Sequence, residues 1–98
     1  MEVELFETPL GKYYLPSGIE SDVIINTIKE GRIFEPEILE VAQRFIRDGT
    51  TVLDLGANFG QMSLLFSEMT GDTGRVYAFE ADPDICQILK MNIKVNGR

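Results

Sequence analysis

The residues with the clearest chemical potential are a glycine-containing stretch, Asp54-Leu55-Gly56-Ala57-Asn58-Phe59-Gly60, and an acidic residue, Glu80. Each follows a short apolar segment rich in β-branched or aromatic residues. Glycines let the chain turn tightly and let a ligand approach the backbone. A carboxylate can accept hydrogen bonds from two vicinal ribose hydroxyls, each contributing about 1.5–3 kcal/mol before ordering costs. The pattern therefore predicts a nucleoside-binding loop.

The spacing of the glycines distinguishes between classes of nucleoside. A dinucleotide fingerprint has glycine at its first, third and sixth positions, but counting from Gly56 the third is Asn58 and the sixth is Gln61. The missing glycines would have let the backbone approach a diphosphate, so a phosphate-free adenosine ligand is favoured. Asp54 would repel a diphosphate but attract a ligand that carries an ammonium and a sulfonium. S-adenosylmethionine carries both.

A parallel sheet is the arrangement that would bring these residues together. Residues 51–55 and 75–80 are predicted to form strands buried on both faces. A helix follows each strand, one with an apolar stripe at Met62, Leu65, Phe66 and Met69 and one that begins at Pro83. The long connections favour parallel strands, and ligands bind at the carboxyl ends of such strands. The predicted fold class is α/β, the opening of a doubly wound sheet.

The segment before the sheet is expected to begin with a β-hairpin. Polar and apolar residues alternate over 2–6 and resume at 13–15, with Pro9 and Gly11 between them. The Tyr13-Tyr14 pair is predicted to lie on the hairpin surface.

Two helices are expected next. Ser21 or Asp22 can cap a helix over 23–28, although its β-branched content leaves a strand possible. Pro36 suits the first turn of another helix, which is predicted to run to Asp48-Gly49. Its apolar stripe consists of Ile38, Val41, Ala42 and Phe45.

Several segments in the expected order give the chain a family resemblance. It resembles the class I S-adenosylmethionine-dependent methyltransferases, and more closely the FkbM-type family, over about residues 31–98. One departure is Ala81, where the family usually has proline. The resemblance implies a Rossmann-like domain whose first half is residues 36–98, with residues 1–35 as an N-terminal hairpin and helix extension. The matching segments are 34–36, 52–60, 74–80 and 92–97.

The resemblance also implies roles for individual residues. Asp54, Gly56 and Gly60 would surround the methionine part of the cofactor, with Asn58 alongside and Glu35 reaching it from the preceding segment. Glu80 would hold the ribose, while Ala81 and Asp82 would border the adenine. The implied cofactor-binding residues are Asp54, Gly56, Ala57, Asn58, Gly60, Glu80, Ala81 and Asp82.

These residues also have plain structural explanations. Gly56 and Gly60 can be turn formers, and Asp54 can cap the following turn. Glu80 can be a solvated strand end, and the main role expected of Asp82 is to cap a helix.

Composition excludes several classes of function. With one cysteine and no histidine among 98 residues, the chain can build neither an internal disulfide nor a zinc finger, and no metal site is expected. A formal net charge of −7 argues against binding to nucleic acid or to an anionic membrane. No apolar run is long enough to span a bilayer and no signal peptide is apparent, so a cytoplasmic location is expected.

The predicted domain is incomplete, because two parallel strands are too few for a stable sheet. The open strand edge is expected to favour self-association. No catalytic base can be named. The predicted function is methyl transfer from S-adenosylmethionine to a hydroxyl of a carbohydrate or small-molecule acceptor, as the resemblance implies. The alternatives are a nucleotide-dependent oxidoreductase and a non-catalytic module that pairs through its exposed strand edge.

Overall fold

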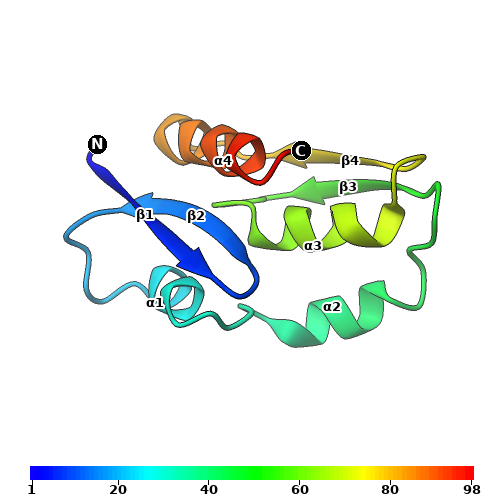
Figure 1. Cartoon of the computed structure of the whole chain (residues 1–98), viewed down its shortest axis with the longest axis horizontal. Helices are drawn as coiled ribbons and strands as arrows, with labels where there is room; N and C mark the ends of the chain where they lie inside the picture. Colours follow the sequence, from blue (N-terminus) through cyan, green and yellow to red (C-terminus); the bar gives the residue numbers. More distant parts are fainter.

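The computed structural model describes all 98 residues and contains two small sheets and four helices (Figure 1). One sheet is an antiparallel hairpin and the other is a parallel pair. No helix is both long and apolar enough to cross a membrane. The elements in chain order are β1 (Val3–Thr8), β2 (Gly11–Pro16), α1 (Val23–Lys29), α2 (Pro36–Ala42), β3 (Thr51–Leu55), α3 (Gln61–Thr70), β4 (Arg75–Phe79) and α4 (Pro83–Val95).

The predicted hairpin and the helix after it are both present. β1 and β2 pair from Val3 opposite Pro16 to Thr8 opposite Gly11. Asp22 caps α1, because its carboxylate accepts the backbone N–H of Ile25 at 3.0 Å. The capping residue is therefore Asp22 and not Ser21, and the segment is a helix and not a strand.

The prediction that both tyrosines of β2 lie on the surface is wrong for Tyr13. Its side chain is fully buried, whereas Tyr14 is half-buried. Alternate residues of a strand point to the same face, so Tyr13 and Leu15 lie together in the core beside Ile25 and Ile28 of α1.

The predicted parallel pair is confirmed, with β3 and β4 in register from Thr51 opposite Arg75 to Leu55 opposite Phe79. α3 packs on this pair. Its predicted stripe is only partly right, because Phe66 is buried while the other three members are half-buried. Leu64, outside that stripe, belongs to the core.

The prediction that both strands are buried on both faces is wrong. Alternate residues on one face of the pair are exposed, by 50–76% of their surface. α3 covers the opposite face, and no element of the chain covers this one. We call this exposed set the bare sheet face; it consists of Leu53, Leu55, Tyr77 and Phe79.

α2 is shorter than predicted and makes little contact with the core. It ends at Ala42, and the chain continues in tighter turns, in which the N–H of Phe45 donates to the carbonyl of Ala42. Three residues of its predicted apolar stripe are exposed and the fourth, Ala42, is half-buried. With no packing partner for the last turn, nothing favours extending the helix to Asp48.

A single core joins the hairpin to the two helices that follow the parallel strands. Its members come from β2, α1, α3, α4 and the loop after β3, and so from both sides of the predicted boundary at residue 35. The buried core residues are Tyr13, Leu15, Ile25, Ile28, Phe59, Leu64 and Ile88.

Candidate functional site

The loop between β3 and α3 turns sharply at the carboxyl end of the sheet. The backbone N–H groups of Gly56 and Ala57 both donate to the carbonyl of Phe79, at 2.9 and 2.8 Å. Gly56 has φ 81° and Gly60 has φ 96°, a region that favours glycine. The loop is therefore fixed to the end of the neighbouring strand β4.

The two loop glycines differ in what surrounds them. A Cβ at Gly60 would lie 2.7 Å from Cδ1 of Leu89, so this glycine lets α3 and α4 approach closely. A Cβ at Gly56 would meet nothing within 4 Å. Of the two, Gly56 is the one whose surroundings leave room for a ligand.

Glu80 reaches the loop directly. One carboxylate oxygen, Oε1, accepts the backbone N–H of Asn58 at 2.8 Å. The other, Oε2, accepts the N–H of Asp82 at 3.1 Å. A carboxylate has about four acceptor positions, so each oxygen keeps capacity for another donor. Loop and carboxylate thus form one connected unit at the ends of β3 and β4.

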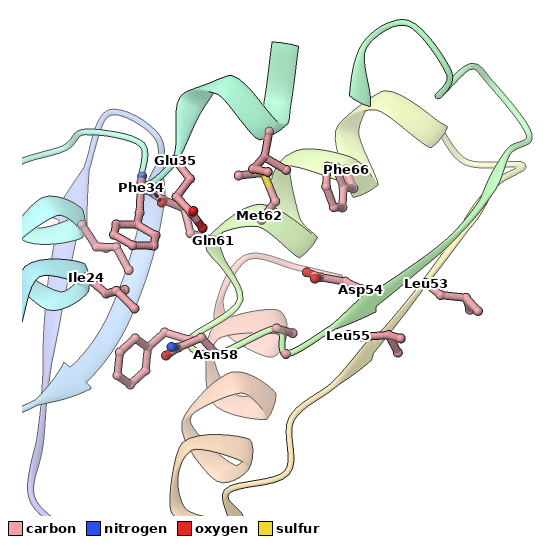
Figure 2. Close-up of a pocket in the computed structure, with 15 residues that line it drawn as sticks. Ile24, Phe34, Glu35, Leu53, Asp54, Leu55, Asn58, Gln61, Met62 and Phe66 are labelled. Carbon is pink, nitrogen blue, oxygen red and sulfur yellow. Dashed lines mark hydrogen bonds between the residues drawn. The ribbon is translucent and has the colours of Figure 1, made fainter. Parts of the chain in front are cut away.

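A cavity of about 510 Å³ opens beside this loop (Figure 2). This volume is in the range of pockets that hold small molecules. Its walls come from α1, the segment before α2, α2 itself, β3, the loop and α3. The lining residues are Ile24, Ile28, Phe34, Glu35, Ile38, Leu53, Asp54, Leu55, Gly56, Ala57, Asn58, Phe59, Gln61, Met62 and Phe66.

The charged groups that line the cavity are all acidic. Figure 2 shows Asp54 reaching into it from β3 and Glu35 from the segment that precedes α2. The hydroxyl of Ser63 donates to Oδ2 of Asp54 at 2.6 Å and fixes that carboxylate. No lysine or arginine lines the cavity. The field inside it therefore favours a ligand with positive charge.

Asn58 presents an unused polar atom at the wall of the cavity. Its backbone is left-handed, with φ 55°, which asparagine tolerates better than most residues. Its Oδ1 atom is buried and has no hydrogen-bond partner in the protein. Buried polar atoms are nearly always paired, so a ligand donor is a natural partner for this one.

Gln61 holds the opposite wall in place. This buried side chain accepts the N–H of Phe34 at 3.0 Å and donates to the carbonyl of Arg32 at 2.8 Å. Glu35, which follows Phe34, has φ 58°, an uncommon conformation for glutamate. The amide of Gln61 thus fixes the segment that carries Glu35 across from the loop.

The predicted cofactor-binding residues fall into two groups. Asp54, Gly56, Ala57 and Asn58 line the cavity. The others lie in or behind the loop, outside the cavity wall, and Asp82 caps α4 by accepting the N–H groups of Asp84 and Ile85. These others are Gly60, Glu80, Ala81 and Asp82.

Sequence reasoning did not find several residues of the site. Gln61 was noted only as a missing glycine, and its contact with a segment 27 residues away has no local signal. Ser63 lies nine residues after Asp54, and only the folded arrangement of β3 and α3 brings the two side chains together. The apolar wall formed by Ile24, Ile28 and Phe34 depends equally on tertiary packing.

Curated proteins similar to part of this chain are protein-L-isoaspartate O-methyltransferases. The one from Aeropyrum pernix is 39% identical over 49 residues, which is 50% of this chain and 19% of that protein. The one from Methanosarcina mazei is 36% identical over 61 residues, 62% of this chain and 23% of that protein. The one from Methanococcoides burtonii is 29% identical over 52 residues, 53% of this chain and 26% of that protein.

The chain therefore matches about a fifth to a quarter of the length of these relatives. No family model matches the chain. No solved structure matches it either. The similarity supports the class of methyltransferases, whereas the finer FkbM-type assignment stays a prediction.

Proposed function

We propose that this chain forms the cofactor-binding part of an S-adenosylmethionine-dependent methyltransferase with a Rossmann-like sheet. The observation that carries the proposal is the hydrogen bond from the Asn58 N–H to Glu80, at the wall of a cavity whose charged groups are Glu35 and Asp54. Similarity to three O-methyltransferases supports the same class.

The residues present fit this cofactor on several grounds. The cofactor carries an ammonium and a sulfonium, and the cavity offers two carboxylates and no competing cation. The buried Oδ1 of Asn58 needs a hydrogen-bond donor. The open space beside Gly56 would let a ligand lie against the backbone.

We assign a role to each side chain on this basis. Asp54, fixed by Ser63, and Glu35 would hold the positively charged methionyl part, and Asn58 would accept a hydrogen bond from it. Glu80 would hold the ribose hydroxyls with its remaining acceptor capacity, and Ala81 and Asp82 would border the adenine at the exposed rim.

S-adenosylmethionine, when bound, supplies an activated methyl group. The chain's own residues would contribute orientation and a preorganised negative field, because the carboxylates of Asp54 and Glu80 are already held by hydrogen bonds before a ligand enters. No residue of the chain is assigned as the base that deprotonates an acceptor.

The acceptor is the finer part of the proposal. The relatives are O-methyltransferases that by name act on protein L-isoaspartate, which is a carboxylate acceptor. The FkbM-type motifs favour instead a hydroxyl of a carbohydrate or small metabolite. Oxygen is the acceptor atom in both cases, so we propose O-methylation.

The cytoplasmic location also remains a prediction.

Calorimetric titration of the chain with S-adenosylmethionine, S-adenosylhomocysteine and NADH tests the proposal. We expect binding of the first two and no binding of NADH, because the loop lacks the glycines that let a diphosphate approach. Binding of NADH in preference to S-adenosylmethionine would favour the oxidoreductase alternative. In sedimentation, a stable oligomer whose size does not change with any of these ligands would favour the interaction module.

Glu80→Gln provides the residue-level test of the same proposal. The amide would place a donor near a backbone N–H that now has an acceptor, and it would weaken the hold on the ribose. We expect about a tenfold weaker affinity for S-adenosylmethionine. Glu40→Gln is the matched control, since it makes the same change at an exposed residue of α2 that lies in neither the loop nor the cavity lining. Undiminished affinity in Glu80→Gln would contradict the assigned role.

A further inference from the structure

The outer edge of strand β2 is paired with side chains instead of another strand. The Asn92 amide accepts the N–H of Tyr14 and donates to the Tyr14 carbonyl at 3.1 Å. Four residues later, at the C-cap of α4, the Asn96 amide does the same with Lys12, at 3.0 and 2.7 Å. We call these two residues the asparagine pair. It attaches the hairpin to α4, because each amide bonds the N–H and the carbonyl of one β2 residue, as a neighbouring strand would.

The members of the asparagine pair differ in burial and in their further hydrogen bond. Asn96 is half-buried, and its Nδ2 donates to the backbone carbonyl of Asn92 at 2.7 Å. Asn92 makes a further hydrogen bond, from Nδ2 to the carbonyl of Phe59 at 2.8 Å. Phe59 belongs to the loop that lines the cavity and lies between Asn58 and Gly60. Asn92 is fully buried, and its partners lie 78 and 33 residues away in the chain. A single amide therefore touches the hairpin and the ligand loop at once.

The nearby contacts of the loop explain why this bond matters. Glu80 holds the N–H of Asn58 on one side of Phe59, and the N–H of Gly60 donates to the carbonyl of Ala57 on the other. With Asn92 on the Phe59 carbonyl, three consecutive residues of the loop are fixed by hydrogen bonds. Loss of the Asn92 bond would leave a carbonyl in the core without its partner.

We propose that Asn92 is a positioning residue for the ligand loop and that it couples docking of the hairpin to binding of the cofactor. The coupling to cofactor binding rests on the proposed function. The positioning of the loop by Asn92 does not depend on it. If the loop and the hairpin share this amide, a ligand that orders the loop must also strengthen the hairpin contact, because coupling between sites is reciprocal.

Two alanine variants of the full chain separate positioning from simple docking. Asn96→Ala removes the hairpin contacts at Lys12 and the bond from Asn96 Nδ2 to the backbone carbonyl of Asn92, and it removes no hydrogen bond to the loop. Asn92→Ala removes equivalent contacts at Tyr14 and also the bond to Phe59. Hydrogen exchange at the Asn58 and Gly60 amides measures order in the loop, and exchange at Lys12 and Tyr14 measures docking of the hairpin.

We expect Asn92→Ala to accelerate exchange at both loop amides and to weaken binding of S-adenosylmethionine about tenfold. Asn96→Ala should accelerate exchange at Lys12 with affinity changed by no more than about twofold. Equal losses of affinity in the two variants would overturn the proposal, because docking alone would then account for both. Unaltered loop exchange in Asn92→Ala would overturn it as well.

The unmodified chain gives a measurement that does not depend on a variant that folds. S-adenosylmethionine should slow exchange of the Tyr14 amide about threefold or more, and unchanged exchange at saturation would refute the coupling. If the chain does not bind the cofactor at all, the proposed function fails. The loop exchange of Asn92→Ala against Asn96→Ala then still decides whether Asn92 positions the loop.

Discussion

Two carboxylates that face the same cavity give it a selective charge. S-adenosylmethionine carries a sulfonium that its product S-adenosylhomocysteine lacks, so the two ligands differ by one positive charge. At a separation of 4 Å, an opposite charge contributes about 4 kcal/mol with an effective dielectric constant near 20. Asp54 is the better-ordered carboxylate, because Ser63 donates to it.

Asp54→Asn should therefore weaken the binding of S-adenosylmethionine by about tenfold or more. The binding of S-adenosylhomocysteine should weaken by much less. Calorimetry on both ligands measures the two losses. The matched control is Glu37→Gln, which removes the same charge from the first turn of α2 outside the cavity. Equal losses for both ligands would contradict the role of Asp54 in charge recognition.

Tyr13 gives a prediction about stability and pH. Burial, with a smaller contribution from Glu68, raises the pKa of Tyr13 to about 12, and its hydroxyl has no hydrogen-bond partner. The unfolded chain has a tyrosine pKa near 10. The unfolded state thus loses this proton first, and folding stability falls as pH rises from about 10 to 12, by up to about 3 kcal/mol.

Tyr13→Phe should remove that part of the alkaline loss of stability. At neutral pH it should be neutral or stabilising, because it deletes a buried hydroxyl that has no partner. Urea unfolding between pH 7 and 12 measures both effects. Tyr14→Phe is the control, and an identical alkaline loss in both variants would show that Tyr13 is not its cause.

At the scale of single residues, the sequence located the loop and Glu80 but not the contacts that hold them. Glycine spacing and the acid after the second strand depend on local sequence, so a pattern can find them. Gln61, Ser63 and Asn92 act on partners that lie 27, 9 and 33 or more residues away. Their amide and hydroxyl groups have no spacing rule, and only the fold brings donors and acceptors together.

At the scale of elements, the two loop glycines are constrained by different things. Gly60 must accommodate both a positive φ and the nearby Leu89, whereas Gly56 has only the positive φ. Gly60→Ala should lower the free energy of unfolding by about 2–3 kcal/mol, and Gly56→Ala by about 1 kcal/mol. Urea unfolding of both variants compares them, and a larger loss in Gly56→Ala would contradict the assigned packing.

The elements themselves were largely predictable, because their signals are local. Asp22 and Asp82 cap helices, and Pro36 and Pro83 open them, as the residue types indicate. The apolar stripe of α2 misled the prediction of its length, because a stripe indicates a helix without showing what covers it. The same holds for β3, whose apolar run predicted burial on both faces.

At the scale of the whole molecule, the bare sheet face is an apolar surface without a partner in the chain. Its four members are aliphatic or aromatic side chains that are at least half exposed. Contiguous apolar surface of this kind favours association. The sequence predicted association through the strand edge, and the exposed face offers a second surface for it.

We expect sedimentation velocity to show association that increases with chain concentration. Tyr77→Lys places a charge in the bare sheet face, outside the cavity lining, and should shift the chain towards monomer. Ile19→Lys is the control, since Ile19 is exposed by 40% but lies between the hairpin and α1. A monomer at every concentration, or the same effect from both variants, would contradict a role for this face.

The asparagine pair has a consequence for which edges can recruit further strands. A strand edge with free N–H and C=O groups is a template for β-augmentation. On β2 the amides of Asn92 and Asn96 already occupy the outward backbone groups of Tyr14 and Lys12. That edge is therefore protected against added strands, as if a covering strand were present, and the hairpin cannot extend its sheet on this side without first releasing α4.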